Sequence, residues 1–414
     1  LNKAITVMSV NGFKATIIQG AWEPVSTNGP GAVRCAWLGN GAILNGFTLQ
    51  NGATFATGDS SQYGPLESGG GAYCVSSNAL VLNCELTNNA AVYGGGAALG
   101  TVDNSLIIAN IAEYGGGALL SSLNNCTVLN NVATGLFPGN QGGAGTCSAI
   151  VRNSIVIDNY DVPYHEPDDA YYLPGSGASI NYAYSCSSGL PLPLPSGAGN
   201  TTADPVFVDL YHISTFSPCY GTGSAAYTTG CDLDNQPWNN PPSMGCSEIV
   251  LSNLVGPLSV SCSAEWTNVV VGHFDGLQGI LQGRAAYISW SFGDGPTYSN
   301  LDYDYFHQWT TSGVYSVTFT AYNNDNPGGV SATVPVNVEF PVPANIQWIG
   351  LVTNGFLFQF ASQMDADYTV QYCTNLTVPI WQTWQQIYFN NQTNIQILDP
   401  SGTNGDRFYR VITR

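Results

Sequence analysis

The chain has 414 residues, of which 44% are hydrophobic and 8% are charged, a composition that excludes an intrinsically disordered protein and leaves room for about two to four domains. Eight basic residues against 27 acidic ones give a net charge of −19, which disfavours nucleic acid or an anionic membrane surface as a partner. No apolar run approaches the roughly 20 residues of a membrane span, so membrane insertion is not expected.

Asparagine recurs in pairs, with the two members of each pair six residues apart. The first members are Asn45, Asn83, Asn104, Asn125 and Asn153, and the second members are Asn51, Asn89, Asn110, Asn131 and Asn159. An alternating apolar segment lies inside every pair, which predicts a short strand with one buried face. Triple glycines at 69–71, 94–96 and 115–117 keep nearly the same period and predict tight corners that exclude a side chain.

The repeat predicts a solenoid. Its clearest period is 21 residues, and a unit of that length with short strands and no helical pattern is typical of one rung of a parallel β-solenoid. Rungs stack at about 4.8 Å, so equal positions form columns. We therefore expect a ladder of side-chain amides at Asn45, Asn83, Asn104, Asn125 and Asn153. A run of loops in an ordinary β-sandwich is the weaker alternative, because five pairs match.

Eleven cysteines show no CxxC and no Cys/His metal spacing, so a zinc site is not expected. Disulfides are the favoured use for some of them, and the odd count leaves at least one thiol unpaired within the chain. Cys84 and Cys126 share a column but lie two rungs, about 9.6 Å, apart, which is beyond disulfide reach, so both are expected to be buried. Cys35 and Cys74 could occupy neighbouring rungs and form a disulfide.

The first part of the chain resembles a known family. KAITVMSVNGFKATIIQG and AILNGFTLQNG resemble rungs of the right-handed parallel β-helix (pectin-lyase-like) proteins that bacteria secrete or display. The later segments TTADPVFVD, STFSPCYGTG, CDLDNQPW and PSMGCSE resemble the closing segment of one such family, whose usual wording is DPLFVD, SPxIDxG, DLDGNPR and GAYE. The resemblance covers residues 1 to about 249. It implies a β-helix with its closing segment over 1–249.

Departures from the family pattern concentrate near cysteines. Tyr220 and Gly221 replace an Ile-Asp, Trp238 replaces an Arg, and Cys246 with Ser247 replaces an Ala-Tyr. A local disulfide is therefore expected among Cys219, Cys231 and Cys246, with Cys186 as a further candidate. In the family more chain precedes the position of Lys3, so the first rung is expected to begin with an open edge. Either a neighbouring molecule covers this edge, which is the favoured interpretation, or a disordered segment precedes it.

Residues 250–340 resemble a PKD-type β-sandwich. The match consists of a W-x-FGDG turn and a following H-x-x-x-x-x-G-x-Y-x-V pattern, carried by Trp290, Phe292, His307, Gly313, Tyr315 and Val317, with Trp309 where the family has Tyr. Asp294 of this turn could be a catalytic or metal-binding carboxylate, but an Asp-Gly turn is the favoured interpretation.

A proline-rich joint, FPVPAN, leads into residues 341–414, which alternate as strands and resemble small β-sandwich modules at the C-termini of bacterial secreted proteins. The fold class expected for the whole chain is therefore all-β, with a right-handed parallel β-helix followed by two β-sandwich (immunoglobulin-like) domains. Aromatic residues of the last domain are either core or a platform for sugar or a partner, namely Trp381, Trp384, Tyr388 and Phe389.

One stretch, DNYDVPYHEPDD, is densely acidic. It could bind calcium or hold an acid/base pair, although a solvated excursion from the solenoid is favoured. Its candidate ligands are Asp158, Asp161, Glu166, Asp168 and Asp169, with His165 beside them. The expected β-helix contains four basic side chains that could act as a base, and none of them lies in an acidic cluster: Lys3, Lys14, Arg34 and Arg152. No Ser-His-Asp arrangement can be proposed from the sequence. No catalytic residue and no cofactor other than calcium is therefore expected.

These features favour a non-enzymatic extracellular scaffold on a bacterial cell surface or in a fibre, with self-association head to tail into filaments as the sharper version. The start at Leu1, without an initiator Met, is interpreted as that of a processed, exported chain. Expected partners are further copies of the chain, other surface proteins or polysaccharide. The alternatives are a secreted carbohydrate-active enzyme, a lyase or glycosidase, and a glycan-binding adhesin.

Overall fold

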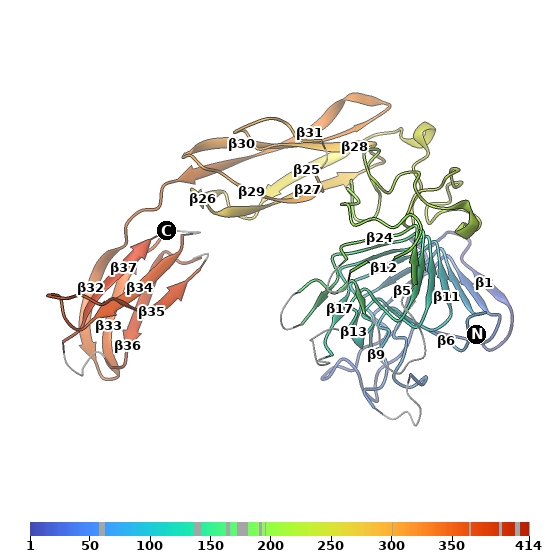
Figure 1. The fold of residues 1–414 in the computed structure, drawn as a ribbon, viewed down its shortest axis with the longest axis horizontal. Coiled ribbons are helices and arrows are strands. Elements are labelled where there is room, and N and C mark those ends of the chain that lie inside the picture. The colour runs from blue at the N-terminus through green and yellow to red at the C-terminus, as the bar shows by residue number, and fades with distance from the viewer. Residues whose placement is uncertain are drawn as a thin grey trace. The chain divides into compact units, whose positions relative to one another are not determined.

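The computed structural model of the chain describes residues 1–57, 63–135, 142–162, 166–171, 181–189, 193–194, 196–299, 301–363, 366–388, 391–401 and 406–413, with the side chains of 348 and 349 left aside. The chain divides into two compact units, Leu1–Leu254 and Val255–Arg414. Apart from the short 3-10 helices η1 (Ala225–Tyr227) and η2 (Leu251–Asn253), the regular structure of the described residues consists of strands (Figure 1). None of their helices is long and apolar enough to cross a membrane.

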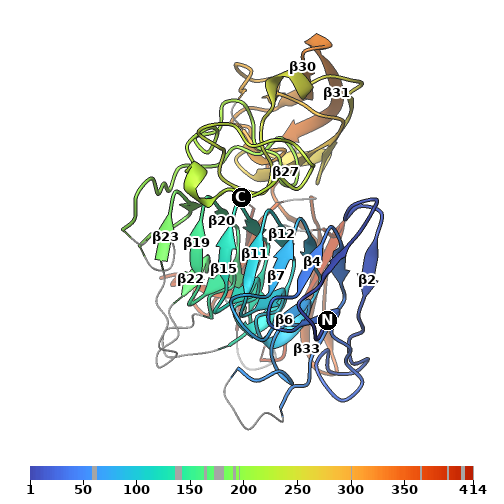
Figure 2. The same ribbon diagram turned by 90° about the vertical axis from the view of Figure 1, so that its right-hand side faces the viewer.

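Short parallel strands stack in the first unit as successive rungs (Figure 2). One sheet contains, in order, β1 (Thr6–Met8), β4 (Ile43–Asn45), β7 (Leu80–Leu82), β11 (Thr101–Asp103), β15 (Ser122–Asn124), β19 (Ile150–Arg152) and β23 (Asn181–Ala183). A second contains β2 (Ile17–Gln19), β5 (Thr48–Gln50), β8 (Glu85–Thr87), β12 (Leu106–Ile108), β16 (Thr127–Leu129), β20 (Ile155–Ile157) and β24 (Cys186–Ser187).

The remaining strands of this unit complete the rungs. A third sheet runs through β3 (Ala36–Leu38), β6 (Ala72–Cys74), β10 (Ala97–Ala98), β14 (Ala118–Leu119), β18 (Thr146–Cys147) and β22 (Ala170–Tyr171). A fourth runs through β9 (Ala90–Tyr93), β13 (Ile111–Tyr114), β17 (Val132–Ala133) and β21 (Tyr160–Asp161). Every pair of neighbours in the four sheets is parallel, as a β-helix requires.

The register of the parallel strands aligns apolar residues of successive rungs, and these residues form the core of the first unit. Val81, Val102, Leu123 and Val151 lie opposite one another in successive rungs, and all four are fully buried. The glycine triplets form the expected corners: a Cβ on Gly95 would lie 2.5 Å from two carbonyl oxygens of the next rung. Only a residue without a side chain permits this approach.

Residues 203–254 lie along the outside of the rungs. The side-chain amide of Asn104 donates to the carbonyls of Thr229 and Cys231, and the Cys246 amide donates to Thr127 Oγ1 at 3.0 Å. Contacts on separate rungs mean that this closing segment ties the stack together lengthwise.

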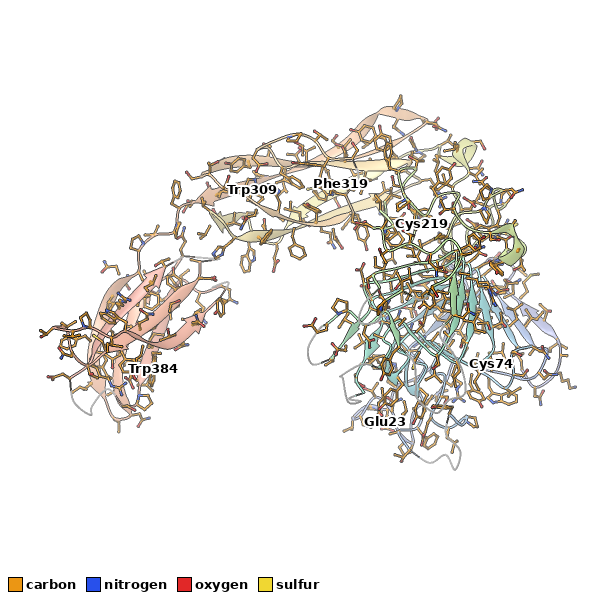
Figure 3. All side chains as sticks on the ribbon, viewed as in Figure 1. Glu23, Cys74, Cys219, Trp309, Phe319 and Trp384 are labelled. Carbon is orange, nitrogen blue, oxygen red and sulfur yellow. The ribbon has the colours of Figure 1, made fainter. Side chains whose placement is uncertain are left out.

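The second unit contains two β-sandwiches. In the first, β25 (Ser259–Ala264), β27 (Phe274–Gln282) and β29 (Asp304–Gln308) face β26 (Asn268–Val270), β31 (Asn326–Glu339), β30 (Gly313–Asn323) and β28 (Tyr287–Ser291). Trp290, Trp309 and Phe319 are fully buried in it, the last two labelled in Figure 3. The second sandwich pairs β32 (Asn345–Val352), β33 (Gly355–Ala361) and β36 (Asn394–Asp399) with β35 (Gln382–Ile387), β34 (Tyr368–Cys373) and β37 (Phe408–Thr413). The predicted fold class, a parallel β-helix followed by two β-sandwiches, is confirmed.

Candidate functional site

The first members of the asparagine pairs form a broken column. Asn83 donates to Asn45 Oδ1 at 3.3 Å and Asn153 donates to Asn125 Oδ1 at 3.5 Å, but the Asn104 amide turns to the closing segment instead. Asn153 also exchanges hydrogen bonds with Ser224 of that segment, at 2.8 Å in each direction. The predicted ladder is therefore interrupted, because the closing segment uses the same polar groups.

A continuous ladder exists in the second members. Asn89, Asn110 and Asn131 each donate from Nδ2 to the Oδ1 of the next asparagine at 2.9 Å, and Asn159 ends the row by donating to Asp169 at 2.9 Å. Each acceptor oxygen also takes the backbone amide of the preceding rung's asparagine. The ladder members are at most 1% exposed. The stacking prediction is correct in kind, but its continuous form lies one column away from the residues named for it.

The acidic stretch belongs partly to this ladder. Asp168 Oδ2 accepts from the amides of Gly142 and Ala144 at 3.0 and 3.1 Å, and Asp161 accepts from the Glu166 amide at 2.8 Å. Burial raises the pKa of Asp168 to about 6. Asp158 and Glu166 point to solvent, and His165 lies outside the described residues.

No three His, Cys, Asp or Glu residues in the described part of the chain form a group that could hold a metal ion. Asp168 Oδ2 and both oxygens of Asp169 accept from internal donors, and Asp168 Oδ1 is buried rather than open to a cation. The calcium site expected here is therefore not assembled by Asp158, Asp161, Glu166, Asp168 and Asp169 in this structure.

All eleven cysteines are free thiols, so the disulfides expected from the sequence are absent. Cys35 and Cys74 are not opposite each other, because the register places Leu38 against Cys74, and Cys35 lies three positions before Leu38. Cys84 and Cys126 are fully buried, as predicted.

Three of the other candidates, Cys186, Cys219 and Cys246, are buried, while Cys231 is half-buried. A hydrogen bond with Cys219, and then burial, raises the pKa of the Cys186 thiol. Cys186 and Cys219 are thus neighbours across the boundary between the last rung and the closing segment.

A cluster that sequence analysis missed surrounds His212. Its Nδ1 lies 2.7 Å from Asp209 Oδ2 and its Nε2 lies 2.7 Å from Asp234 Oδ2, so the ring is clasped by two carboxylates. Asp234 also accepts from the Tyr211 hydroxyl at 3.0 Å and from Lys14 Nζ at 3.1 Å. Burial opposes the charge of Asp209, but the charge and hydrogen bonds of His212 outweigh it and lower the pKa of that carboxyl. The cluster joins the closing segment to the first rung.

The aromatic residues of the last sandwich are partly covered by arginines. The guanidinium of Arg410 lies 4.3 Å from the ring centre of Trp381, and that of Arg407 lies 5.9 Å from the ring centre of Trp384. Tyr388 is 60% exposed, and Phe389 lies outside the described residues. Cation–π contacts of this kind stabilise the sandwich and leave Tyr388 as the open ring.

The first rung presents an outer edge. Ile43 N donates to Ile5 O and Ser9 N donates to Asn45 O, so alternate residues of the first strand bond to the second rung. The amides and carbonyls of Thr6 and Met8 therefore point the other way, where no described strand pairs with β1. β2 has the same arrangement, because Thr48 N donates to Thr16 O and Gly20 N donates to Gln50 O.

Apolar side chains accompany this edge. Ile5, Met8, Val10 and Ile17 are 50%, 62%, 92% and 54% exposed, in a chain whose later rungs bury most of theirs. The edge of β3 differs, because the Leu1 amino group donates to the Trp37 carbonyl at 2.7 Å. The open part of the edge is therefore β1 and β2. We call these two strands and the exposed side chains at 5, 8, 10 and 17 the first-rung edge.

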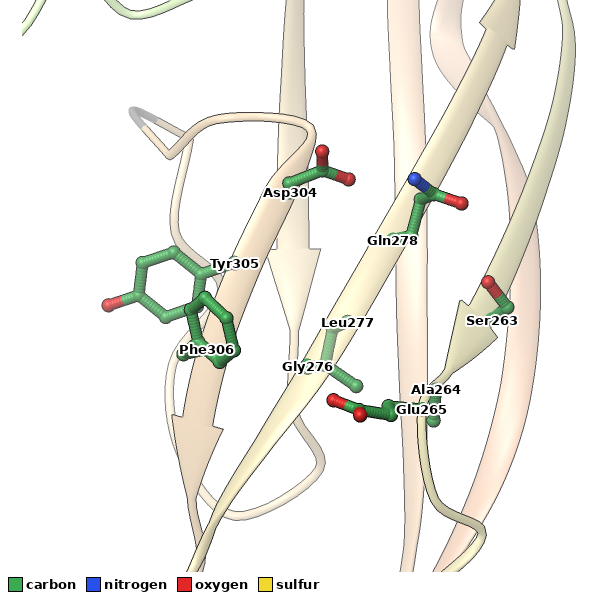
Figure 4. Close-up of a pocket in the computed structure, with 9 residues that line it drawn as sticks. All are labelled: Ser263, Ala264, Glu265, Gly276, Leu277, Gln278, Asp304, Tyr305 and Phe306. Carbon is green, nitrogen blue, oxygen red and sulfur yellow. The ribbon is translucent and has the colours of Figure 1, made fainter. Parts of the chain in front are cut away.

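A groove lies on the outer face of the first sandwich (Figure 4). It has a volume of about 400 Å³ and is lined by Ser263, Ala264, Glu265, Gly276, Leu277, Gln278, Asp304, Tyr305 and Phe306. Three neighbouring strands, β25, β27 and β29, supply these residues. No motif marks them in the sequence, since the face exists only once the strands pair.

No protein-family model matches the chain, and no curated protein matches its sequence. Similar solved structures include carbohydrate-binding modules of the β-sandwich superfamily, at 12% identity over 38% of this chain and 96% of that one, with a TM-score of 0.19. Fibronectin(III)-like modules of CbhA from Clostridium thermocellum match at 10% identity, covering 37% and 84%, with a TM-score of 0.20. Chicken CNTN1 FN1–FN3 domains match at 10% identity, covering 38% and 58%, with a TM-score of 0.19. At these TM-scores the likeness carries no argument about function.

Proposed function

We propose that this protein is a non-enzymatic structural scaffold of a bacterial cell surface or extracellular fibre, and that copies associate through the first-rung edge. The observation that carries the proposal is that no strand of the described residues pairs with the outer edges of β1 and β2, which carry exposed apolar side chains. Such an edge is a template for another strand, and proteins normally cover it.

Charge favours another copy of the chain as the partner. Residues 1–57 contain Lys3, Lys14 and Arg34 but only one acidic residue, Glu23, whereas the whole chain carries −19. Residues 1–57, which include the first-rung edge, thus carry a net charge of +2, whereas the rest of the chain carries −21, and Lys14 is already paired with Asp234 of the closing segment. Opposite charges steer a head-to-tail encounter, and a contact that does not close produces a filament.

The finer family assignment is part of the same proposal. The sequence motifs of the rungs and of the closing segment support a pectin-lyase-like β-helix. The burial of Trp290 and Phe292 in the first sandwich supports a PKD-type domain. Both resemblances come from exported bacterial proteins, which supports an extracellular location. The non-enzymatic part is supported by His212, whose two ring nitrogens are both engaged by carboxylates.

The test is the mass of the purified chain as a function of concentration, by sedimentation and light scattering, together with electron microscopy. Proline at Met8 and Ile17 removes outward-facing amides without removing a bond to the second rung, so Met8→Pro/Ile17→Pro should abolish association. Met8→Ala/Ile17→Ala is the matched control that trims the side chains but keeps the amides. We expect that control to associate more weakly than the wild type, because apolar contact is lost, but still to associate at higher concentration, whereas the proline variant should not.

Two results would contradict the proposal. One is a wild-type chain that stays monomeric at every concentration and ionic strength. The other is release of unsaturated or reducing ends from a polysaccharide by the pure protein, which would support the enzyme alternative.

A further inference from the structure

The groove on the first sandwich arises from a missing side chain. Gly276 faces outward on β27 directly opposite Phe306 of β29, and its place on the sheet surface is empty. The nearest atoms to a Cβ there would all belong to side chains, namely the carboxylate end of Glu265 at 3.0 Å, the edge of the Phe306 ring at 3.4 Å and Glu265 Cβ at 3.6 Å. Backbone conformation does not require glycine at this position, since its φ lies outside the left-handed region.

Gly279, three residues later on the same strand, is the instructive contrast. A Cβ on Gly279 would lie 2.6 to 2.7 Å from three atoms of the buried Phe319 ring, so core packing alone accounts for that glycine. No such account exists for Gly276. A glycine inside a strand that packing does not require marks a place where another molecule can approach the backbone closely.

Aromatic and polar side chains surround the gap in a mixed pattern. Phe306 is 67% exposed and Phe274, its diagonal neighbour on the same face, is 59% exposed. Gln278 lies between Ser263 on one neighbouring strand and Asp304 on the other. An exposed ring beside hydrogen-bonding groups suits a ligand that has both C–H faces and hydroxyl groups.

The charged residues that line the groove further restrict the chemical class of ligand that it can bind. Glu265 and Asp304 are acidic, and none of the nine lining residues is Lys, Arg or His. Burial raises the pKa of Asp304, while its hydrogen bond with Gln278 acts in the opposite direction. Acidic groups accept hydrogen bonds from hydroxyl or ammonium donors and repel carboxylates and sulfates.

A protein partner fits this face less well. Ser, Glu and Asp are depleted at protein interfaces, yet β25 presents Ser259, Ser261 and Ser263 in a row on its exposed side, beside the two acids of the groove. The groove volume of about 400 Å³ instead falls in the range of small-molecule sites.

We propose that this groove binds a polysaccharide of hexopyranose units that carry no carboxylate or sulfate groups. Phe306 stacks on the C–H face of one sugar, and the neighbouring unit reaches Phe274. Hydroxyl groups of the sugar over Gly276 donate to the carboxylates of Glu265 and Asp304, and Gln278 bonds to the same unit. The site is separate from the first-rung edge and does not depend on self-association.

The experiment is calorimetric titration of the full chain with soluble β-linked gluco-oligosaccharides and amino-sugar oligomers, with oligogalacturonate as the charged comparison. Phe306→Ala should weaken binding by about tenfold or more, which corresponds to one lost stacking contact. Gly276→Gln should do the same by filling the groove, and no backbone contact opposes that substitution. Tyr388→Ala, at the exposed ring of the last sandwich, is the matched aromatic control and should bind as the wild type does.

Each other outcome would overturn the proposal. Wild-type protein that binds neither neutral nor amino-sugar oligomers, or that prefers oligogalacturonate, would refute the ligand class. Unchanged affinity in both groove variants, or loss of binding in Tyr388→Ala instead, would refute the site. If Gly276→Gln prevented self-association while no sugar bound, the occupant would be a second copy of the chain. Thermal unfolding of each variant shows whether a loss of binding reflects the groove or a loss of fold.

Discussion

Asp169 terminates the asparagine ladder, because its Oδ1 accepts both the backbone amide of Asn159, at 3.2 Å, and the side-chain amide, at 2.9 Å. In the rungs before it, an asparagine oxygen has the same two donors. Asp169 Oδ2 is engaged by the Ser188 amide at 3.1 Å. The carboxylate therefore takes the place of an amide oxygen at the end of the ladder, and its second oxygen accepts from Ser188 of the last rung.

Removing this cap should destabilise the β-helix. Asp169→Ala leaves the buried backbone amide of Asn159 without an acceptor and removes one of the three acceptors of its side-chain amide. We expect a loss of about 1–3 kcal/mol in the free energy of unfolding, measured by urea denaturation. Asp169→Asn should lose less, since it keeps an oxygen for Asn159 but turns an NH₂ toward Ser188. Glu166→Ala, at an exposed side chain of the same acidic stretch, is the control and should change little. An equal effect of the two alanine variants would contradict the capping role.

The free energy of unfolding should change with pH because Asp168 ionises. Burial raises its folded-state pKa to about 6, above the ordinary value of 3.8. The folded state then binds a proton that the unfolded state has lost, so this group's contribution is fully present below about pH 4 and is lost as the pH rises to about 6. Asp168→Asn removes the titration but keeps an oxygen for Gly142 and Ala144.

The stability of Asp168→Asn relative to the wild type should therefore rise between pH 4 and pH 7, by about 3 kcal/mol at most. Chemical denaturation at both pH values gives this difference while other carboxyl groups titrate equally in both proteins. A relative stability that stays constant or falls over that range would show that the carboxyl is not buried as described.

Local repetition explains what the sequence could predict. The strands between asparagines and the glycine corners recur every rung, so periodicity alone identifies them, and the fold class follows. Which column is continuous could not be predicted, because both members of each pair have the same spacing. The choice depends on the closing segment, whose Thr229 reaches Asn104 across 125 positions of the chain.

The His212 cluster and the groove could not be predicted either, because they too depend on residues that are brought together only by the fold. Lys14 and Asp234 are 220 positions apart, and no local pattern connects them with His212. The groove depends on register, which places Gly276 opposite Phe306 and Gln278 opposite Asp304. Expected disulfides failed for a related reason: Cys35 and Cys74 occupy adjacent rungs, but register separates them along the strands.

The contacts of His212 with Asp209 and Asp234 should hold the closing segment to the first rung. His212→Ala leaves Asp209 and Asp234 facing each other's charge at a largely buried site, and we expect a destabilisation of about 3–5 kcal/mol. Faster hydrogen exchange and proteolysis should appear in residues 203–254 before they appear in the rungs. Lys14→Ala is the matched control on the exposed side of the same cluster and should cost less than about 1 kcal/mol. Hydrogen exchange that becomes faster throughout the rungs as well would contradict a role of His212 limited to the closing segment.

Thiol counting tests the covalent state of the chain. With all eleven cysteines free, protein unfolded without reductant should react with eleven equivalents of a thiol reagent, and a count of nine would reveal one disulfide. Cys186 and Cys219 are the pair to examine first in that case, because the hydrogen bond between them places the two sulfurs close together. In folded protein the half-buried Cys35, Cys231 and Cys262 should react before the eight that are buried. If the count is nine and Cys219→Ser raises it to ten, the last rung and the closing segment are joined covalently, and the free-thiol description of that boundary is incorrect.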